Sequence, residues 1–281
     1  MVRYLFILTF NSLFCLGIGS ISIPHDAIEL ASSNSGVANS KNIGINFASI
    51  NNVKNSFSFS SVSWYQGVKG GNISYKWGKN HHHHINLYTL SGNDIGLWYD
   101  VPNDEPTDLF DIHHISASYG FGTSFSNKFN VGLNNSVIYN QLYLDESYGY
   151  NLDLGLSYLY NETLSFGISI NQLGFENSGE SFTCYPILAG IGTSIHLRSL
   201  KTQFNTDLIY DESLSNQTMF RISSVTKFPY ISLITGYNHS DLKKEFSCGI
   251  SFQYRKIEFD YGISFHSALG NPIILSLKYH I

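Results

Sequence analysis

Apolar and polar side chains alternate along the C-terminal part of the chain, in residues 245–254, 257–265 and 273–281. In each segment every second side chain is apolar, and the side chains between are mostly small or polar. An alternation with a period of two predicts β-strands that have one apolar and one polar face. The Arg255-Lys256 pair between the first two segments predicts a tight turn.

The same alternation predicts strands along most of the chain. The other twelve predicted strands are residues 57–65, 71–77, 85–90, 95–99, 113–125, 129–139, 150–160, 164–172, 187–196, 200–210, 217–226 and 230–239. Residues 25–52 are the part after the N-terminus that least resembles strands. Residues 27–31 suit a helical turn, and residues 32–40 are small and polar.

Short and long connections alternate between the predicted strands. The short ones are residues 126–128, 161–163, 197–199, 227–229 and 255–256, and the long ones are residues 100–111, 140–149, 173–186, 211–216 and 240–244. A bacterial outer-membrane barrel has short turns on its periplasmic rim and longer loops on its outer rim. A β-sandwich gives no reason for this alternation. The pattern therefore favours an all-β fold, an antiparallel transmembrane β-barrel.

The number of strands needs one adjustment. The twelve strands and the three C-terminal strands make fifteen, whereas a closed bacterial barrel of one chain usually has an even number. We therefore expect that one of the short early segments is wrongly assigned, or that residues 43–50 add a strand. The prediction is about 14 strands, with 16 as the alternative.

The charged residues of the predicted strands lie on the face opposite to the apolar one. They are Lys76, Asp100, Asp153, Lys201, Asp207, Arg221, Arg255, Glu258, Asp260 and Lys278. A Lys or Arg that faces lipid at the middle of a bilayer costs about 2–4 kcal/mol, so lipid would enforce this segregation. We expect Asp153, Asp207, Glu258 and Asp260 to be polar residues of the lumen, paired with Arg221, Arg255 and Lys278. Small inward side chains such as Ser116, Ser118 and Gly120 leave room for water, a plug or an apolar ligand.

Composition and the N-terminus indicate the compartment. Only 13% of the 281 residues are charged, against roughly 25% in an average soluble domain, and the net charge of −5 argues against a nucleic-acid partner. Arg3 followed by an apolar stretch and small residues up to Ser22 predicts a cleaved signal peptide over residues 1–22. The prediction is a bacterial outer-membrane protein, with an N-terminal segment or plug in residues 23–52 and a barrel in residues 53–281. A loose periplasmic tail is the alternative for the N-terminal segment.

Candidate chemistry is sparse. The four consecutive histidines His81, His82, His83 and His84 offer metal ligands. Consecutive side chains on a strand alternate between its faces, which favours a polar loop at the outer rim over a metal site. His113 and His114 could add metal ligands if they approached these four histidines. No nucleophile motif such as G-x-S-x-G is present, so the protein is not expected to be an enzyme, and no cofactor is expected. Cys184 and Cys248 remain after signal cleavage, either as a disulfide or as two unpaired residues.

Several short motifs resemble the PorV/PorQ family of outer-membrane barrels, whose architecture is related to the long-chain fatty-acid transporters. The matching residues include Trp64, Asp153, Gly155, Asp260, Tyr261, His266, Leu269, Gly270 and Asn271. The chain departs from the family at Ser35-Gly36-Val37-Ala38, where the family has a glycine-rich motif with methionine, and at Ile281, where the family ends on an aromatic residue.

The resemblance implies a barrel of about fourteen strands that touches outer-membrane lipid. It also implies a role in type IX protein secretion or surface attachment, with the barrel docking secreted cargo or secretion components. The alternative is an outer-membrane channel or transporter for hydrophobic small molecules, of the fatty-acid-transporter type. An apolar lumen pocket and a plug in residues 25–52 would distinguish this alternative.

Overall fold

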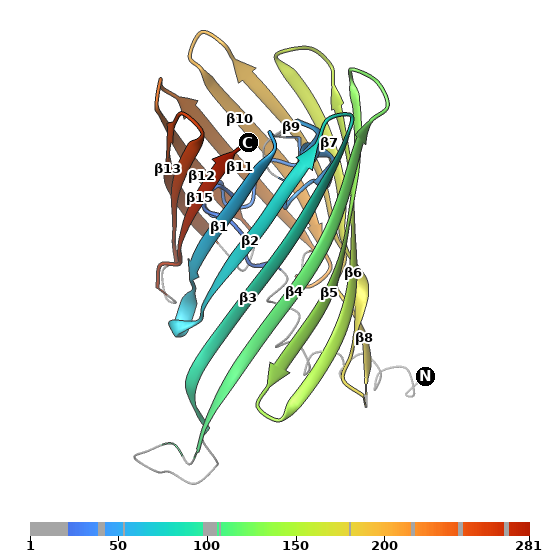
Figure 1. Cartoon of the computed structure of the whole chain (residues 1–281), viewed down its shortest axis with the longest axis vertical. Helices are drawn as coiled ribbons and strands as arrows, with labels where there is room; N and C mark the ends of the chain where they lie inside the picture. The colour runs from blue at the N-terminus through green and yellow to red at the C-terminus, as the bar shows by residue number, and fades with distance from the viewer. Residues whose placement is uncertain are drawn as a thin grey trace.

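The computed structural model describes residues 22–38, 43–52, 54–97, 106, 108–179, 181–214, 217–240, 244–266 and 270–281. An antiparallel β-barrel accounts for most of them (Figure 1). Its strands are β1 (Ser56–Ser63), β2 (Lys69–Gly78), β3 (His81–Leu97), β4 (Asp108–Ser124), β5 (Phe129–Leu142), β6 (Asp145–Leu159), β7 (Leu164–Asn177), β8 (Phe182–Cys184), β9 (Leu188–Leu197), β10 (Thr202–Asp211), β11 (Thr218–Lys227), β12 (Ile231–His239), β13 (Lys244–Tyr254), β14 (Ile257–Phe265) and β15 (Ile273–His280). The helical elements described are α1 (Ala27–Ala31) and the 3-10 helices η2 (Phe47–Asn52) and η3 (Tyr65–Gly67).

Every strand of the barrel wall has two hydrogen-bonded neighbours. Consecutive strands pair with each other, β7 pairs with β9, and β1 pairs with β15 to close the cylinder. In the described part of the chain the wall has fourteen strands, because β8 is a short extra strand that pairs only with the end of β7. Closure satisfies the backbone groups of every wall strand, which lipid cannot do. The predicted all-β transmembrane barrel of about 14 strands is confirmed, and the alternative of 16 is not needed.

Two predicted details of the wall are wrong. Residues 85–90 and 95–97 belong to the single strand β3, which is interrupted by a register shift between Gly92 and Ile95, where Asp94 has a positive φ of 57°. Residues 98–99 of the second predicted strand lie outside the described residues. Residues 140–149 are not a long loop, because β5 and β6 remain paired as far as Leu142 and Asp145 around a two-residue turn. In both places polar residues remain paired with the neighbouring strand, beyond the stretch in which apolar and polar residues alternate.

The two faces of the wall have the opposite polarity to those of a soluble barrel, with apolar side chains outside and polar side chains inside. On β1, Phe57 and Phe59 are 46% and 49% exposed, whereas Ser58 and Ser60 between them are buried. The same alternation of exposed apolar and buried polar residues recurs around the cylinder. An exposed apolar face is what lipid requires of a barrel wall. The architecture is that of an outer-membrane β-barrel. None of the described helices is long and apolar enough to span a membrane.

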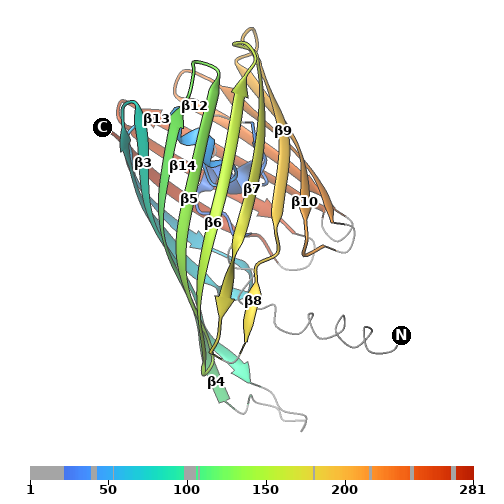
Figure 2. The ribbon, with the colours of Figure 1, turned by 90° about the vertical axis from the view of Figure 1, so that its right-hand side faces the viewer.

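The N-terminal segment, residues 22–38 and 43–52, lies inside the cylinder (Figure 2). Helix α1 contacts β13, β14 and β15, and η2 contacts β4, β5 and β6, so the segment crosses between opposite parts of the wall. Ala27, Val37 and Ala48 are fully buried. The predicted signal peptide falls almost entirely outside the described residues.

Candidate functional site

Helix α1 is fixed to the wall through its first residues. The Asp26 carboxylate accepts hydrogen bonds from the backbone N–H groups of Ile28 and Glu29, each at 2.9 Å, and so caps the helix. The same carboxylate lies 3.3 Å from the Lys278 ammonium, which lies 3.3 Å from the Asp260 carboxylate. The Ala27 N–H donates to Ser276 Oγ at 2.9 Å. Burial opposes ionisation of Asp26, but Lys278 and the capping N–H groups hold its pKa below the usual range.

Two neighbouring titratable residues of the segment are shifted towards their neutral forms. Burial and the charge of Asp26 raise the pKa of the Glu29 carboxyl from 4.5 to about 8. This carboxyl accepts hydrogen bonds from the backbone N–H groups of His25 at 2.8 Å and Gly44 at 3.1 Å. Burial and the nearby His114 lower the pKa of His25 from 6.5 to about 4. Near neutral pH the segment therefore places little net charge here beyond that of Asp26.

A second attachment lies on the opposite part of the wall. Asp207 on β10 accepts hydrogen bonds from the backbone N–H groups of Gly36 and Val37. Asn46 Nδ2 donates to the Val37 carbonyl within the segment at 2.7 Å, and to the carbonyls of Leu156 and Ile168 in the wall. Asp207 thus binds backbone N–H groups of the segment that would otherwise be buried without partners, and Asn46 joins the segment to backbone carbonyls of the wall.

Glycines of the wall allow the 3-10 helix η2 to approach closely. A Cβ added to Gly120 would lie 1.9 Å from the Phe47 ring, one added to Gly132 would lie 2.3 Å from the Phe47 carbonyl oxygen, and one added to Gly155 would lie 2.0 Å from Asn46 Oδ1. Each distance is shorter than any real contact of a Cβ atom. The glycines of β4, β5 and β6 therefore form the docking surface of η2.

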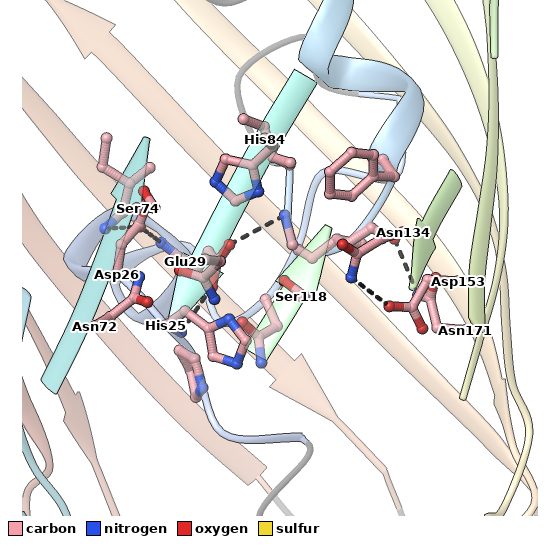
Figure 3. A pocket seen from close by; sticks show the side chains of 18 of the residues that line it. His25, Asp26, Glu29, Asn72, Ser74, His84, Ser118, Asn134, Asp153 and Asn171 are labelled. Atoms are coloured by element: carbon pink, nitrogen blue, oxygen red, sulfur yellow. Dashed lines mark hydrogen bonds between the residues drawn. The ribbon is translucent and has the colours of Figure 1, made fainter. Parts of the chain in front are cut away.

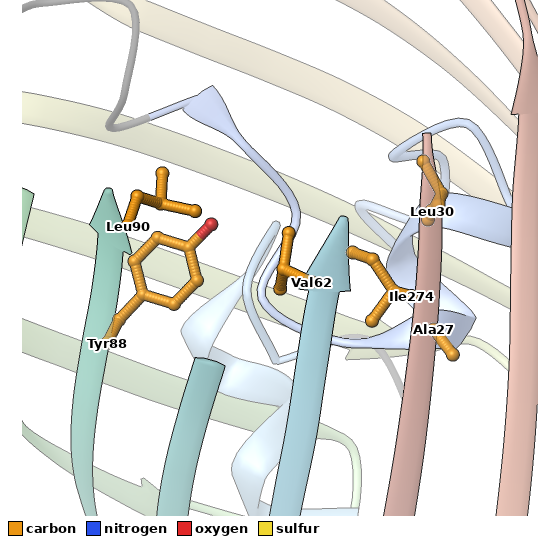
Figure 4. Close-up of a cluster of buried hydrophobic side chains, with 6 residues drawn as sticks. All are labelled: Ala27, Leu30, Val62, Tyr88, Leu90 and Ile274. Atoms are coloured by element: carbon orange, nitrogen blue, oxygen red, sulfur yellow. The ribbon is translucent and has the colours of Figure 1, made fainter. Parts of the chain in front are cut away.

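An apolar cluster completes the packing of α1. It contains Ala27, Leu30, Val62, Tyr88, Leu90 and Ile274, which come from α1, β1, β3 and β15 (Figure 4). These are inward side chains in a wall whose inner face is mostly polar. The cluster gives α1 an apolar contact in addition to its ion pairs and hydrogen bonds.

A cavity of about 360 Å³ remains between the N-terminal segment and the wall (Figure 3). Its wall side carries a belt of hydrogen-bonding side chains, one from each of eight adjacent strands, directly paired in register. The belt consists of Glu258, Lys278, Ser58, Ser74, Asn86, Ser118, Ser136 and Asn151. The segment contributes apolar side chains on the other side, among them Ile23, Ile28, Ile45 and Phe47. The cavity is therefore amphipathic, with a polar wall and a partly apolar floor.

Beside the belt, Asp153 organises a group of amides. It lies where the register of β6 and β7 shifts between Leu152 and Leu154. Its carboxylate accepts hydrogen bonds from Asn134 Nδ2 at 3.1 Å, from Asn151 Nδ2 at 3.0 Å and from the Gln172 N–H at 3.0 Å (Figure 3). Asn134, Asn151 and Asp153 all line the cavity.

The residues of the predicted family signature do not form one site. Asp153 lines the cavity, Gly155 contacts the segment, and Asp260 belongs to the ion-pair network of Lys278. Trp64 and His266 both neighbour Tyr65 in the connections at the rim opposite to the short turns. Of the remaining four, Leu269 lies outside the described residues, and Tyr261, Gly270 and Asn271 lie on β14 or in the connection that follows it.

The expected ion pairs of the lumen form only in part. Lys278 pairs with Asp260 as predicted, but Glu258 accepts from His280, and Asp153 and Asp207 are bound by amide and backbone N–H groups. Arg221 donates to the Asn34 carbonyl at 2.8 Å, so it too holds the N-terminal segment. The sequence pattern identifies the inward face but not these partners.

The histidine run forms no loop, which corrects that prediction. Its members His81, His82, His83 and His84 are the first four residues of strand β3. His82 pairs with Gly78 and Gly122 in the ladder, and His83 stacks on Trp77. His83 Nδ1 lies 2.8 Å from the Tyr119 hydroxyl, and His84 lines the cavity.

The histidines do not gather into a metal centre within the described part of the chain. His113 and His114 pair with Ser91 and Leu90, away from the run of four. Among the described residues, no three His, Cys, Asp or Glu side chains are placed to hold a metal ion. The ladder separates the two histidine groups along β3 and β4, and His84 and His114 are the members of each that line the cavity.

The two cysteines lie on different strands. Cys184 is exposed at the end of β8, and Cys248 is partly buried on β13. Both are free thiols, so they do not form the disulfide that the sequence left open.

Comparison with known proteins adds information on the fold. No protein-family model and no curated protein matches the sequence. The toluene transporter TbuX of Ralstonia pickettii is similar in structure, with a TM-score of 0.66 at 9% identity over 91% of this chain and 98% of that one. The toluene transporter TodX of Pseudomonas putida has a TM-score of 0.63 at 13% identity, over 92% and 96% of the two chains. A FadL homologue of Pseudomonas aeruginosa has a TM-score of 0.60 at 7% identity, over 92% and 99%.

This chain has the fold of the FadL-type outer-membrane barrels. The likeness covers nearly the whole of each chain, and it includes the fatty-acid-transporter architecture that the resemblance to the PorV/PorQ family implied. At these identities it establishes the fold alone. Membership of the PorV/PorQ family itself gains no support from these structures.

Proposed function

We propose that this protein is a channel through which small molecules with an apolar part cross the outer membrane. The observation that carries the proposal is the amphipathic cavity between the N-terminal segment and the wall. Its volume of about 360 Å³ lies in the range of small-molecule sites, roughly 300–1,000 Å³. Structures with this fold include transporters of toluene and a monoaromatic hydrocarbon channel, which supports the choice of substrate size and class.

The comparisons support this alternative better than a role in type IX secretion. The structures reported above are transporters or homologues of one, and they give no support to cargo or secretion components as partners. Nor do they include an enzyme. In this proposal residues 1–22 are a leader that is cleaved on export, residues 23–52 are a plug that forms one side of the substrate site, and residues 53–281 are the barrel.

Uptake by intact Gram-negative cells tests the proposal. We expect cells that express this chain to take up labelled toluene several-fold faster than cells without it. Ser136→Trp, which fills the cavity from β5, should remove this gain. Val137→Trp is the matched control, because the neighbouring side chain is 59% exposed on the lipid face. Uptake that is unchanged by expression of the chain, at verified insertion into the outer membrane, would contradict the proposal.

A further inference from the structure

The Asp153 carboxylate fixes the orientation of two amides of the cavity wall. A carboxylate oxygen accepts hydrogen bonds, whereas an amide has a donating nitrogen and an accepting oxygen. Because Asn134 and Asn151 both approach Asp153, each must turn its NH₂ group towards the carboxylate. The Gln172 N–H completes the set of donors. The carbonyl oxygens of both amides therefore point away from Asp153.

Those oxygens belong to a group of four acceptors around the cavity. Within the described residues, Oδ1 of Asn72, Asn86, Asn134 and Asn151 is buried and has no hydrogen-bond partner. All four residues line the cavity, and Asn72, Asn86 and Asn151 are only 5%, 4% and 3% exposed. A buried acceptor is costly unless a donor reaches it. The site is thus rich in acceptors that require O–H or N–H donors.

The charges around the cavity favour a neutral donor. Its lining includes four acidic side chains, four Lys or Arg side chains and four histidines. The acidic residues are Asp26, Glu29, Asp153 and Glu258, and the basic ones are Lys54, Lys76, Arg221 and Lys278. Because Glu29 is largely neutral near pH 7, the remaining acidic charges and the Lys and Arg charges differ by about one, so the lining offers neither an ammonium group nor a carboxylate a strong excess of opposite charge. Hydroxyl groups meet the demand for donors without adding charge.

We infer that the cavity selects neutral molecules that carry hydroxyl groups on an apolar skeleton. The hydroxyl groups donate to the amide oxygens of Asn134 and Asn151 on β5 and β6, and of Asn72 and Asn86 on β2 and β3. The apolar part lies against the side chains of the N-terminal segment, such as Ile45 and Phe47. The inference rests on the proposed channel function and narrows its substrates from small molecules with an apolar part to those that also carry hydroxyl groups.

The affinities of three compounds that share one aromatic ring distinguish recognition of hydroxyl groups from binding of the apolar ring. The compounds are toluene, 4-methylcatechol, which adds two hydroxyl groups, and 3,4-dimethoxytoluene, which keeps the oxygen atoms but cannot donate. We expect the full-length protein in detergent, titrated by calorimetry, to bind 4-methylcatechol at least about tenfold more tightly than either of the other two. The paired substitution Asn134→Leu with Asn151→Leu should bring the three affinities to within about threefold of one another.

Asn205→Leu is the matched control. Asn205 is also a buried amide inside the barrel, bonded to Ser194 and Ser223 and outside the cavity lining, so the preference for 4-methylcatechol should persist. If the first pair of substitutions prevents folding, Asn72→Leu with Asn86→Leu should reduce the same preference. Equal binding of toluene and 4-methylcatechol by the unaltered protein would overturn the inference and leave the channel function standing. Binding of none of the three rings, together with unchanged toluene uptake by cells, would overturn both.

Discussion

Single charged residues inside the barrel hold the N-terminal segment in place. Asp207 binds backbone N–H groups that lie 170 and 171 positions earlier in the sequence, and Lys278 joins Asp26 to Asp260. The alternation of the strands predicts that Asp207, Asp260 and Lys278 face inward. It cannot predict the partners that Asp207 and Lys278 have in the N-terminal segment, because this segment has no periodic pattern. Almost any residue can donate its backbone N–H to a carboxylate, so the type of the donating residue does not reveal the contact.

Docking of the N-terminal segment should weaken between pH 6.5 and 8. Glu29 has a pKa of about 8 in the docked state against an ordinary 4.5, so the docked state holds a proton that is lost as the pH rises through this range. His25 has a pKa of about 4 against 6.5, which favours docking as the pH rises to 6.5. The two effects oppose each other below pH 6.5. Of these two effects only that of Glu29 remains above pH 6.5, and it amounts to about 2 kcal/mol by pH 8.

Limited proteolysis of the segment across this pH range measures the effect. Cleavage within residues 22–52 should accelerate from pH 6.5 to 8 in the unaltered protein, and Glu29→Gln, which stays neutral, should remove most of the acceleration. Glu162→Gln is the control, because Glu162 is an exposed residue of a short turn, paired with Arg198. An identical pH profile for Glu29→Gln and the unaltered protein would refute the assignment.

At the scale of elements, the fit of η2 to the wall depends on glycines that have no side chain. Gly132→Ala would place a methyl group 2.3 Å from the Phe47 carbonyl oxygen. Since that neighbour is backbone, we expect η2 to move and docking to weaken by about 1–3 kcal/mol. Gly71→Ala is a milder change in the wall, with its nearest atom, the Ser60 carbonyl oxygen, at 3.1 Å.

Two measurements on the same samples separate docking from barrel folding. Gly132→Ala should increase protease cleavage of the N-terminal segment and leave unchanged the heat-dependent electrophoretic mobility that reports a folded barrel. Gly71→Ala should change neither. If Gly132→Ala left cleavage at the rate of the unaltered protein, the close approach of η2 to the wall would be wrong.

The elements themselves were predictable wherever apolar residues mark one face. That alternation marks fifteen segments, and the even number usual for a closed barrel gave the prediction of about 14, which agrees with the wall. The error at β3 arises at a bulge, where two consecutive side chains interrupt the period. The extension of β5 and β6 escaped prediction because both faces of a strand can be polar beyond the membrane. The polar belt also escaped, since it depends on the register between strands. The pattern shows that Asn86 and Ser118 face inward but not that they are paired.

At the scale of the molecule, short motifs were a weak guide to family. Matching residues such as Asp260 and Tyr261 belong to strands in which large apolar residues alternate with small or polar ones, as lipid on one side and a lumen on the other require of any barrel strand. They therefore recur in barrels of different function.

The wall of the barrel is taller on one side, because β3 to β7 have 14–17 residues and the other wall strands 8–11 (Figure 2). The tall side carries Asn86, Asn134, Asn151 and Asp153, which places most of the candidate site on the long strands.

The inverted polarity of the whole barrel predicts a depth-dependent cost of charge on its outer face. Ile168, 51% exposed, lies within the central part of β7, and Phe129, 45% exposed, begins β5 beside a short turn. In lipid, Ile168→Arg should lower the free energy of unfolding by about 2–4 kcal/mol and Phe129→Arg by about 0–1 kcal/mol, because an arginine near the interface reaches water. Reversible denaturant unfolding in lipid vesicles measures both, with Ile168→Leu as the control for the loss of shape. Equal costs at the two positions would mean that the apolar face does not meet a bilayer, and the membrane orientation of the barrel would then be wrong.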